Sequence, residues 1–294
     1  MKASLANLRI RMLPSDRVNL GLDKTHNPEF TICEFYSTYT SLAQLQILTE
    51  RLFRSIANHV SFLGETSTNA GCNHAINASY FPDLEDDPFP QIDFISALNS
   101  ALKQDLPNLG SETARADLIR IFKQKSIPLP SKSTVPVLLD KLSSIYLEPQ
   151  CQQFTFIVNH PECMSPLSKS FIHPTAPNAQ PVAARAELFV QGREIVNCYE
   201  EENSPFEQRR KFQMQQYYAS GDGTGAPKDL EAMSVDEDYL QSLEWGLPPT
   251  GGWGCGIDRL VMLFAGKERI GEVLSFGNLR AVTRGAEKRD RGES

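Results

Sequence analysis

The chain has 294 residues, a formal net charge of −7 and 40% hydrophobic residues, a composition typical of folded globular proteins. This excludes a mainly disordered, collagen-like or disulfide-scaffold protein, and no uncharged apolar run approaches the ~18 residues of a membrane-spanning helix. The acidic balance argues against nucleic-acid binding over the whole surface, although one local basic face remains compatible with it. The six cysteines and five histidines are scattered without a CxxC pair, so no zinc site is predicted.

The N-terminal part combines a basic segment with a strand and a helix. Residues 1–20 carry four basic side chains and one acid, which loosely resembles a mitochondrial presequence; a basic N-terminus without targeting function is the alternative. Residues 30–36 predict a strand from their β-branched and aromatic content. Apolar residues at spacings of three, four and seven predict a helix that ends near Gly64. The predicted apolar face consists of Leu42, Leu45, Leu48, Leu52, Ile56 and Leu63.

The pattern of residues 64–150 predicts a helical insertion that contains few candidate catalytic or binding residues. Ser111 is the expected N-cap of a helix at 112–125, and a second helix is expected to end near Pro149. Residues 154–159 then predict a strand.

The remaining pattern predicts a hairpin followed by helices. Two strand-like runs, AELFV and EIVNCY, are joined by Gln191-Gly192-Arg193, which indicates a tight turn. Ser204 and Ser234 begin capping boxes of two helices. A last helix is expected from about Asp258, and residues 282–294 are expected to be a disordered tail. Strands and helices without βαβ alternation indicate an α+β fold, with an antiparallel sheet flanked by helices.

The segment 187–203 is the richest in chemistry. Asn197, Tyr199 and Glu201 share one strand face, where they suit a cationic ligand; exposed carboxylates on a surface strand are the more common explanation. Glu187 and Glu194 are candidate magnesium ligands. Glu194 and Asn197 have opposite strand parity, so one common site requires a bulge between them.

Two further segments carry weaker signals. Glycines at 251–256 allow close approach of a ligand to the backbone and lead into a helix that begins with Asp258 and Arg259, where an arginine can bind phosphate. On the strand 30–36, Phe30, Glu34 and Tyr36 share a face that could stack on a base and bind an amine. A half-buried strand explains the same pattern.

Together and in this order, these segments resemble the class II aminoacyl-tRNA synthetases, in particular the lysine-specific members. The resemblance lies in GLDKTHNPEFTICEFY, HPECMSPLSK, RAELFVQGREIVNCYEEENSPFEQRRKF and LEWGLPPTGGWGCGIDRLVMLF. It covers residues 21–63 and 154–281 and is closest to fungal mitochondrial forms. It implies a partial catalytic domain at 21–281, preceded by a divergent leader for which disorder is one expectation.

The resemblance implies binding of ATP, Mg²⁺, lysine and tRNA(Lys), and activation of lysine as its adenylate before transfer to the tRNA. Catalytic roles fall on His26 and Arg259. The implied ATP contacts are Phe30, His26, Arg259 and Gly256. The implied lysine contacts are Glu34, Tyr36, Asn197, Tyr199 and Glu201, and the implied magnesium ligands are Glu187 and Glu194. No membrane partner is expected, and the location is expected to be mitochondrial, with the cytoplasm as the alternative.

The sequence departs from the family pattern in two respects. The motif 2 arginine that holds the α-phosphate falls on Val18, and the glutamate that helps hold lysine falls on Leu20. Motif 1, through which the family forms homodimers, and the anticodon-binding barrel have no counterpart, so the chain resembles a truncated synthetase. Two alternatives follow: a catalytically inactive, synthetase-derived binding or regulatory protein, and an enzyme that transfers lysyl groups to proteins without tRNA.

Overall fold

A computed structural model describes residues 4–11, 29–66, 87–175, 179–219 and 235–274. Contacts divide the described chain into two units. The larger comprises residues 36–50, 87–175, 179–219 and 235–253, and the smaller comprises 4–11, 29–35, 51–66 and 254–274. Two predictions lie outside the described residues: the site residue His26 and the tail at 282–294. The predicted cap at Ser234 was wrong, because the helix Glu237–Glu244 has Asp236 as its N-cap, and Asp236 Oδ1 accepts the Tyr239 N–H at 2.9 Å.

The expected α+β class with a mostly antiparallel sheet is confirmed. Within the larger unit the strand order is β2-β9-β8-β7-β4-β3, and β1 lies next to β2 in the smaller unit. The strands are β1 (Ser4–Arg11), β2 (Glu29–Thr38), β3 (Gln91–Asp93), β4 (Thr155–Val158), β7 (Arg185–Val190), β8 (Arg193–Glu200) and β9 (Thr250–Gly256). Pairing is antiparallel for β4–β7 and β7–β8 and parallel for β3–β4. A separate two-stranded sheet joins β5 (Ser170–Ile172) to β6 (Pro181–Ala183).

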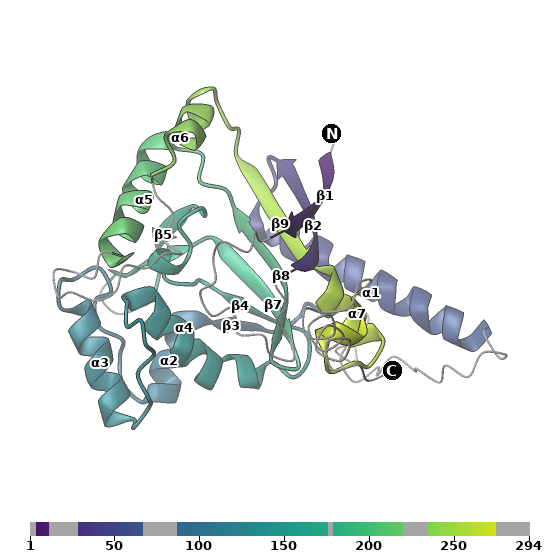
Figure 1. Cartoon of the computed structure of the whole chain (residues 1–294), viewed down its shortest axis with the longest axis horizontal. Coiled ribbons are helices and arrows are strands. Elements are labelled where there is room, and N and C mark those ends of the chain that lie inside the picture. Colours follow the sequence, from purple (N-terminus) through teal and green to yellow (C-terminus); the bar gives the residue numbers. More distant parts are fainter. Residues whose placement is uncertain (1–3, 12–28, 67–86, 176–178, 220–234, 275–294) are drawn as a thin grey trace, which may run out of the picture. The chain divides into compact units, whose positions relative to one another are not determined.

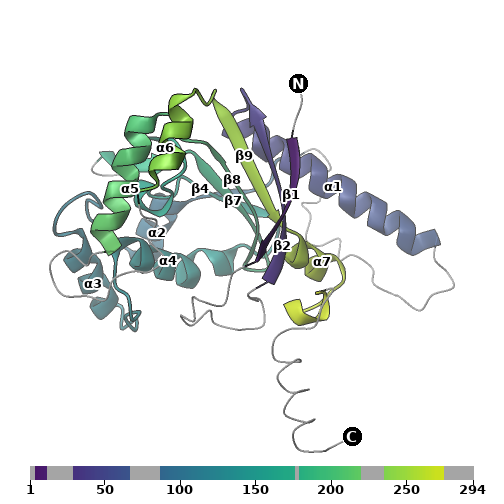
Figure 2. The same cartoon turned by 45° about the horizontal axis from the view of Figure 1, so that its top comes forward.

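Helices complete both units. They are α1 (Leu42–Thr66), α2 (Phe94–Leu102), α3 (Ala114–Gln124), α4 (Val135–Tyr146), α5 (Pro205–Ala219), α6 (Glu237–Glu244) and α7 (Ile257–Phe264). In the larger unit, α2, α3 and α4 gather beside β3 and β4 (Figure 1), and α5 lies alongside α6 (Figure 2). None of the described helices has the length and apolar content needed to cross a membrane.

Residues 64–150, the expected helical insertion, supply both helices and a strand of the main sheet. Strand β3 pairs with β4, and α2, α3 and α4 contribute most of one buried cluster. Leu118, Phe122, Leu138 and Leu139 are fully buried there, together with Ile157 of β4 and Phe189 of β7. The described part of this segment is therefore continuous with the core that supports the strands.

The hairpin prediction is confirmed in its details. Gln191 and Gly192 connect β7 to β8, and both have positive φ (52° and 66°). This is the backbone of the tight turns whose twist matches antiparallel strands. The N-cap at Ser204 is also confirmed, since its hydroxyl accepts the Glu207 N–H at 3.4 Å and α5 begins at Pro205. The reciprocal half of the predicted capping box does not form, because the Ser204 N–H donates to Glu202 Oε1 at 3.1 Å.

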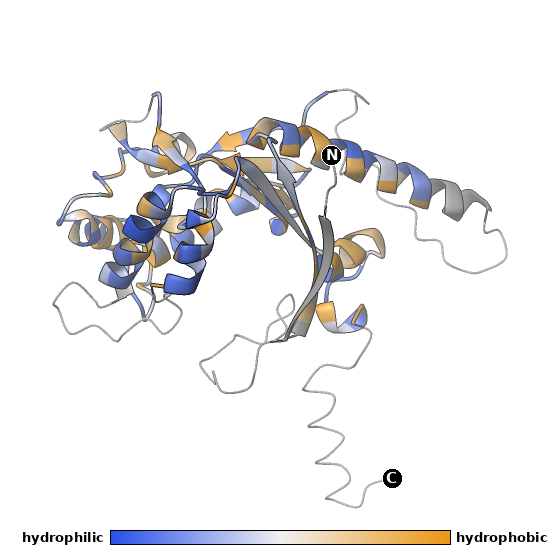
Figure 3. Cartoon of the chain, turned by 90° about the horizontal axis from the view of Figure 1, so that it is seen from above, coloured by the Kyte–Doolittle hydropathy of each residue, from blue (hydrophilic) through white to orange (hydrophobic). Residues whose placement is uncertain are grey.

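Two local predictions were wrong in detail. Ser111 does not cap α3, which begins at Ala114 with Thr113 in the cap position. The helix α1 forms as predicted, and hydrophilic and hydrophobic residues alternate along it (Figure 3), but its buried face is rotated from the predicted one. Leu48 and Leu52 are 42% and 37% exposed, whereas the polar Thr49 is fully buried. Thr49 Oγ1 accepts the Trp253 Nε1–H at 2.8 Å, a contact between residues distant in sequence that local spacing cannot predict.

The place of α4 in the core gives a stability prediction. Leu138→Ala is expected to lower the free energy of unfolding by about 2–5 kcal/mol, because it removes a fully buried side chain and leaves a cavity. Ile145→Ala, on the same helix but 37% exposed, is the control and is expected to cost under about 1 kcal/mol. Urea denaturation measures both changes. Equal, small losses would show that α4 does not contribute to a shared core.

Candidate functional site

A β-bulge in the hairpin resolves the parity conflict between Glu194 and Asn197. Glu187 pairs with Asn197 and Phe189 pairs with Glu194, and the register shifts between Leu188 and Phe189. One residue of β7 therefore spans two of β8, with Ile195 as the extra residue. Residues opposite each other share a face, so Glu187, Asn197 and Glu194 lie on the same face of the sheet.

A pocket of about 510 Å³ opens in the larger unit and brings together three predicted lysine contacts. Tyr36, Tyr199 and Glu201 line it, as does Tyr239 of α6. The other lining residues are Leu167, Asp236, Ser242, Leu243, Gly246, Leu247 and Thr250. Acidic and phenolic groups thus surround a cavity that is otherwise partly apolar.

Glu201 is the most buried acidic group of this pocket, with only 6% of its surface exposed. Its backbone is held on both sides: its N–H donates to Thr250 O of β9 at 2.8 Å, and Ser168 bridges to it from the opposite direction. The adjacent Gly252 leaves room for the side chain. A Cβ at position 252 would overlap Glu201 Oε1 and lie 3.3 Å from Tyr36 Cε1.

The roles of the glycines therefore differ from the close ligand approach that the sequence suggested. Gly252 accommodates the chain's own Glu201 carboxylate. A Cβ at Gly251 would lie 2.8 Å from Thr40 O and 2.9 Å from Leu45 Cδ1, so this glycine permits close packing. At Gly256 a Cβ would meet only ordinary contacts at 3.9 Å, both from Arg259.

The electrostatics of the pocket disfavour further negative charge. Burial raises the pKa of Tyr199 above its ordinary value, and the nearby Glu201 carboxylate raises it further. Burial and the Glu201 carboxylate likewise raise the pKa of Tyr239. Both phenols therefore remain protonated at neutral pH. A cationic group is the ligand that relieves the unfavourable field.

Asn197 and Glu187 are held by a neighbouring arginine on β7. Arg185 Nε donates to Asn197 Oδ1 at 3.0 Å, and Arg185 Nη2 forms a short ion pair with Glu187 Oε1. The other Glu187 oxygen contacts His160 Nε2 at 2.9 Å. Burial opposes ionisation of Glu187, but Arg185 and His160 outweigh it and lower the pKa of this carboxyl group to about 2.

Glu187 and Glu194 fit magnesium in donor type but do not form a complete site. In the parts of the chain that the structure describes, no group of three or more His, Cys, Asp or Glu side chains could hold a metal ion. Magnesium commonly uses one or two carboxylates and takes its remaining oxygens from substrate phosphates and water. Glu194, on this face of the hairpin, fits that mode of binding in donor type, whereas both oxygens of Glu187 are already engaged by Arg185 and His160.

The predicted nucleotide contacts that are described lie in the smaller unit. Phe30 is partly buried on β2, and Arg259 is partly buried on α7. Glu34, predicted as a lysine contact, is also partly buried on β2 in this unit. The Thr31 N–H donates to Asp258 Oδ2 at 2.6 Å, and Asp258 is 9% exposed. Asp258 therefore ties the start of α7 to β2, which places the backbones of Phe30 and Arg259 on adjoining elements.

The family description "tRNA synthetases class II (D, K and N)" matches residues 19–280. The chain belongs to this family. It is similar to the mitochondrial lysine–tRNA ligases of Schizosaccharomyces pombe (44% identity) and Saccharomyces cerevisiae (35%), with 90% of this chain and 47% of each relative covered. The lysine–tRNA ligase of Enterococcus faecalis is 35% identical over 89% of this chain and 48% of its own length. The chain thus spans about half the length of these relatives.

Sequence reasoning missed several residues of this candidate site. Tyr239 lines the pocket from α6, a helix that the sequence predicted without assigning it any chemistry. His160 and Arg185 orient Glu187, and both occur in segments quoted for the resemblance. Their contacts depend on strand pairing: His160 follows β4, which pairs with β7, and Arg185 reaches Asn197 across β7 and β8.

The raised pKa of Tyr199 predicts a loss of stability at alkaline pH. In the unfolded chain this phenol ionises near pH 10, whereas in the folded chain its pKa is higher. Its contribution to stability is therefore complete below about pH 10 and is lost as the pH rises above that value. Tyr199→Phe is expected to reduce the fall in unfolding free energy between about pH 8 and about pH 10.5. Denaturant titrations at both pH values measure this. An identical fall in variant and wild type would contradict the burial of Tyr199.

Proposed function

We propose that this chain contains the amino-acid-activating centre of a lysine–tRNA ligase. One observation carries the proposal: a buried carboxylate, Glu201, stands in a pocket lined by Tyr36, Tyr199 and Tyr239. A carboxylate binds an ammonium group through charge-assisted hydrogen bonds, and phenol rings add cation–π attraction. Among the three amino acids of the family, lysine alone carries a cationic side chain.

The remaining residues are assigned by their positions in the family pattern. Glu34 and Asn197 contribute to lysine binding beside the pocket residues. Phe30 stacks on adenine, His26 lies near the triphosphate, and Arg259 clamps the adenine side and the γ-phosphate. Gly256 precedes Arg259 at the start of α7 and completes the proposed nucleotide contacts.

In the proposed reaction, an oxygen of the lysine carboxylate attacks the α-phosphorus of ATP while the bond to the leaving pyrophosphate breaks. A hydroxyl at the 3′ end of tRNA(Lys) then attacks the lysyl carbonyl of the adenylate, the bond to AMP breaks, and AMP leaves. The protein contributes orientation and charge stabilisation rather than a covalent intermediate. The family pattern assigns magnesium, which would neutralise phosphate charge, to Glu187 and Glu194; Glu187 would have to share the oxygens that contact Arg185 and His160.

Partners and location follow from the same proposal. Lysine, ATP and tRNA(Lys) are the substrates, and the protein is placed in mitochondria on its similarity to two mitochondrial relatives. The cytoplasm is the alternative, since a relative from Encephalitozoon cuniculi is described as cytoplasmic. Homodimerisation belongs to the family's motif 1, so no dimer is proposed from this sequence.

A second candidate is a lysine-binding protein that does not form the adenylate. Val18 stands where the family pattern has the arginine that grips the α-phosphate. Loss of such a group costs a factor of about 10²–10³ in rate. A protein of this kind would bind lysine in the same pocket without releasing pyrophosphate.

Lysine-dependent ATP–pyrophosphate exchange by the 294-residue chain tests the proposal, with aspartate and asparagine as substrate controls. Exchange is expected with lysine alone. Lysine binding without exchange, measured by calorimetry, would favour the second candidate. If the folded chain shows neither lysine binding nor exchange, both candidates are contradicted.

The pocket assignment is tested by Glu201→Gln. The variant is expected to lose lysine binding by at least about 100-fold, because the ammonium then lacks its charged partner, while ATP affinity stays nearly unchanged. Glu200→Gln is the matched control; its carboxylate accepts the Leu42 N–H at 3.0 Å and is not among the pocket-lining groups. Retained lysine affinity in Glu201→Gln would remove Glu201 from the site.

Arg259→Ala tests the nucleotide contact. It is expected to weaken ATP binding by about tenfold or more, because a phosphate then loses a bidentate partner. Lys267→Ala, which removes an exposed cation 3.6 Å from Glu272, controls for general loss of positive charge in the same unit. Fluorescence titration with an ATP analogue measures both. An unchanged ATP affinity in Arg259→Ala would contradict the assignment.

A further inference from the structure

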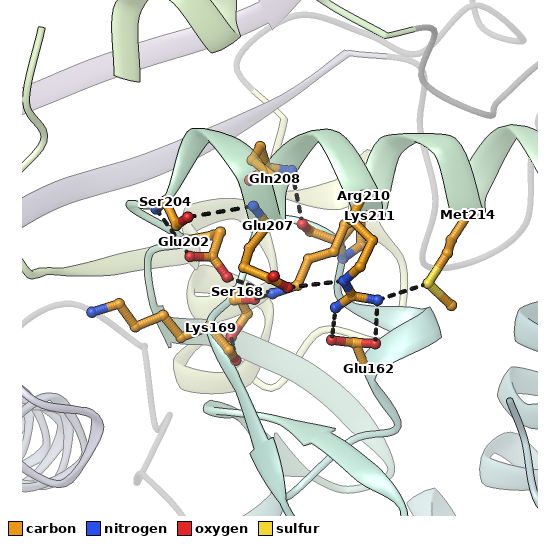
Figure 4. A network of polar contacts seen from close by, with 11 residues as sticks. Glu162, Ser168, Lys169, Glu202, Ser204, Glu207, Gln208, Arg210, Lys211 and Met214 are labelled. Carbon is orange, nitrogen blue, oxygen red and sulfur yellow. Dashed lines mark hydrogen bonds and ion pairs between the residues drawn. The ribbon is translucent and has the colours of Figure 1, made fainter. Parts of the chain in front are cut away.

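Helix α5 carries a lysine that is almost completely buried. Lys211 is 3% exposed, and its Nζ donates to Glu202 Oε2 at 2.7 Å and to the carbonyl oxygen of Ser168 at 2.5 Å (Figure 4). Burying an ammonium group is costly unless it is paired and hydrogen-bonded. Such a group is seldom retained on a helix that only needs to pack against its neighbours.

The two partners of Lys211 belong to the two segments that frame the pocket. Ser168 follows Leu167, which lines the cavity, and Glu202 follows Glu201. These segments are joined by backbone hydrogen bonds: Glu202 N–H donates to Leu167 O at 2.8 Å, and Lys169 N–H donates to Glu200 O at 2.7 Å. Lys211 adds a charged contact across the same junction between residues 167–169 and 200–202, which we call the seam.

The adjacent glutamates perform different tasks. Glu201 lines the pocket, whereas both oxygens of Glu202 are engaged by the protein. Glu202 Oε2 takes Lys211, and Oε1 accepts the Ser204 N–H at 3.1 Å, just before α5 begins. Gln208, one turn before Lys211, donates to Pro166 O at 2.9 Å. The loop 166–169, residue 202 and α5 thus form one connected polar network.

We infer that Lys211 is a positioning residue of the proposed lysine pocket. Its ammonium clamps loop 166–169 to Glu202 and thereby fixes Leu167 and the backbone of Glu201, which lie on the cavity wall. The effect on lysine affinity rests on the proposed function, but the clamp itself can be measured without any substrate.

The neighbouring arginine provides a matched control. Arg210 also joins α5 to another segment, the short helical turn Glu162–Met164, through an ion pair with Glu162 at 2.6 Å. It also contacts Glu207 on its own helix at 2.9 Å (Figure 4). Neither glutamate is a lining residue of the pocket. Arg210→Met therefore removes another ion pair of α5, one whose cation is more exposed than Lys211, and leaves the contacts beside Glu201 in place.

Amide hydrogen exchange of the complete chain tests the clamp directly, in the wild type and in Lys211→Met, Lys211→Arg and Arg210→Met. Lys211→Met is expected to accelerate exchange at Lys169 and Glu202 by about tenfold or more, since a hydrogen bond to a charged group is worth that factor. Exchange within β7 and β8 is expected to stay unchanged. Lys211→Arg, which keeps a charged donor, is expected to restore most of the protection.

Calorimetric titration with lysine and with ATP gives the functional readout. Lys211→Met is expected to weaken lysine binding about tenfold and leave ATP binding unchanged, while Arg210→Met changes neither. If Lys211→Met fails to fold because Glu202 is left unpaired, the double variant Lys211→Met, Glu202→Gln removes the orphaned charge. It is expected to fold and to show the same faster exchange and weaker lysine binding.

Three results would overturn the inference. Unchanged exchange at Lys169 and Glu202 in the folded variants would show that Lys211 does not hold the seam. An equal effect of Arg210→Met on exchange would show that Lys211 only helps to dock α5. Equal losses of affinity for lysine and for ATP would show a global defect. If the wild type binds no lysine, the proposed function fails, and the exchange data still decide the clamp.

Discussion

The burial of one carboxylate constrains most of the architecture around the pocket. Glu201 can occupy its position only because Gly252 on the neighbouring strand has no side chain, and because β9 and loop 166–169 hold its backbone from two sides. Removing a negative charge from water is costly, and in the proposed function a cationic ligand would offset part of that cost. The tyrosines around it complete a cavity that suits an ammonium group.

A single β-bulge places the other polar candidate residues on one face of the sheet. The bulge at Ile195 changes the parity of β8, so that Glu194 joins Glu187 and Asn197 on one face. Without it, Glu194 would face the opposite side of the hairpin. On this same face, α2, α3 and α4 pack against Ile157, which lies opposite Glu187, and against Phe189.

The sequence predicted features governed by local chemistry. The turn at Gln191 and Gly192, the cap at Ser204 and the need for a bulge all follow from neighbouring residues, and the structure contains each of them. The buried face of α1 was predicted wrongly because Thr49 is buried by its bond to Trp253, 204 positions away. Tyr239 was missed for the same reason: α6 reaches the cavity only through tertiary packing.

The central claim is that the pocket recognises a cationic side chain through Glu201. Calorimetric titration of the chain with lysine and with norleucine, which has the same carbon chain without the terminal ammonium group, tests it most directly. Lysine is expected to bind at least about 10³-fold more tightly, because norleucine offers no ammonium group to the buried carboxylate. Equal affinities for the two amino acids would contradict the account.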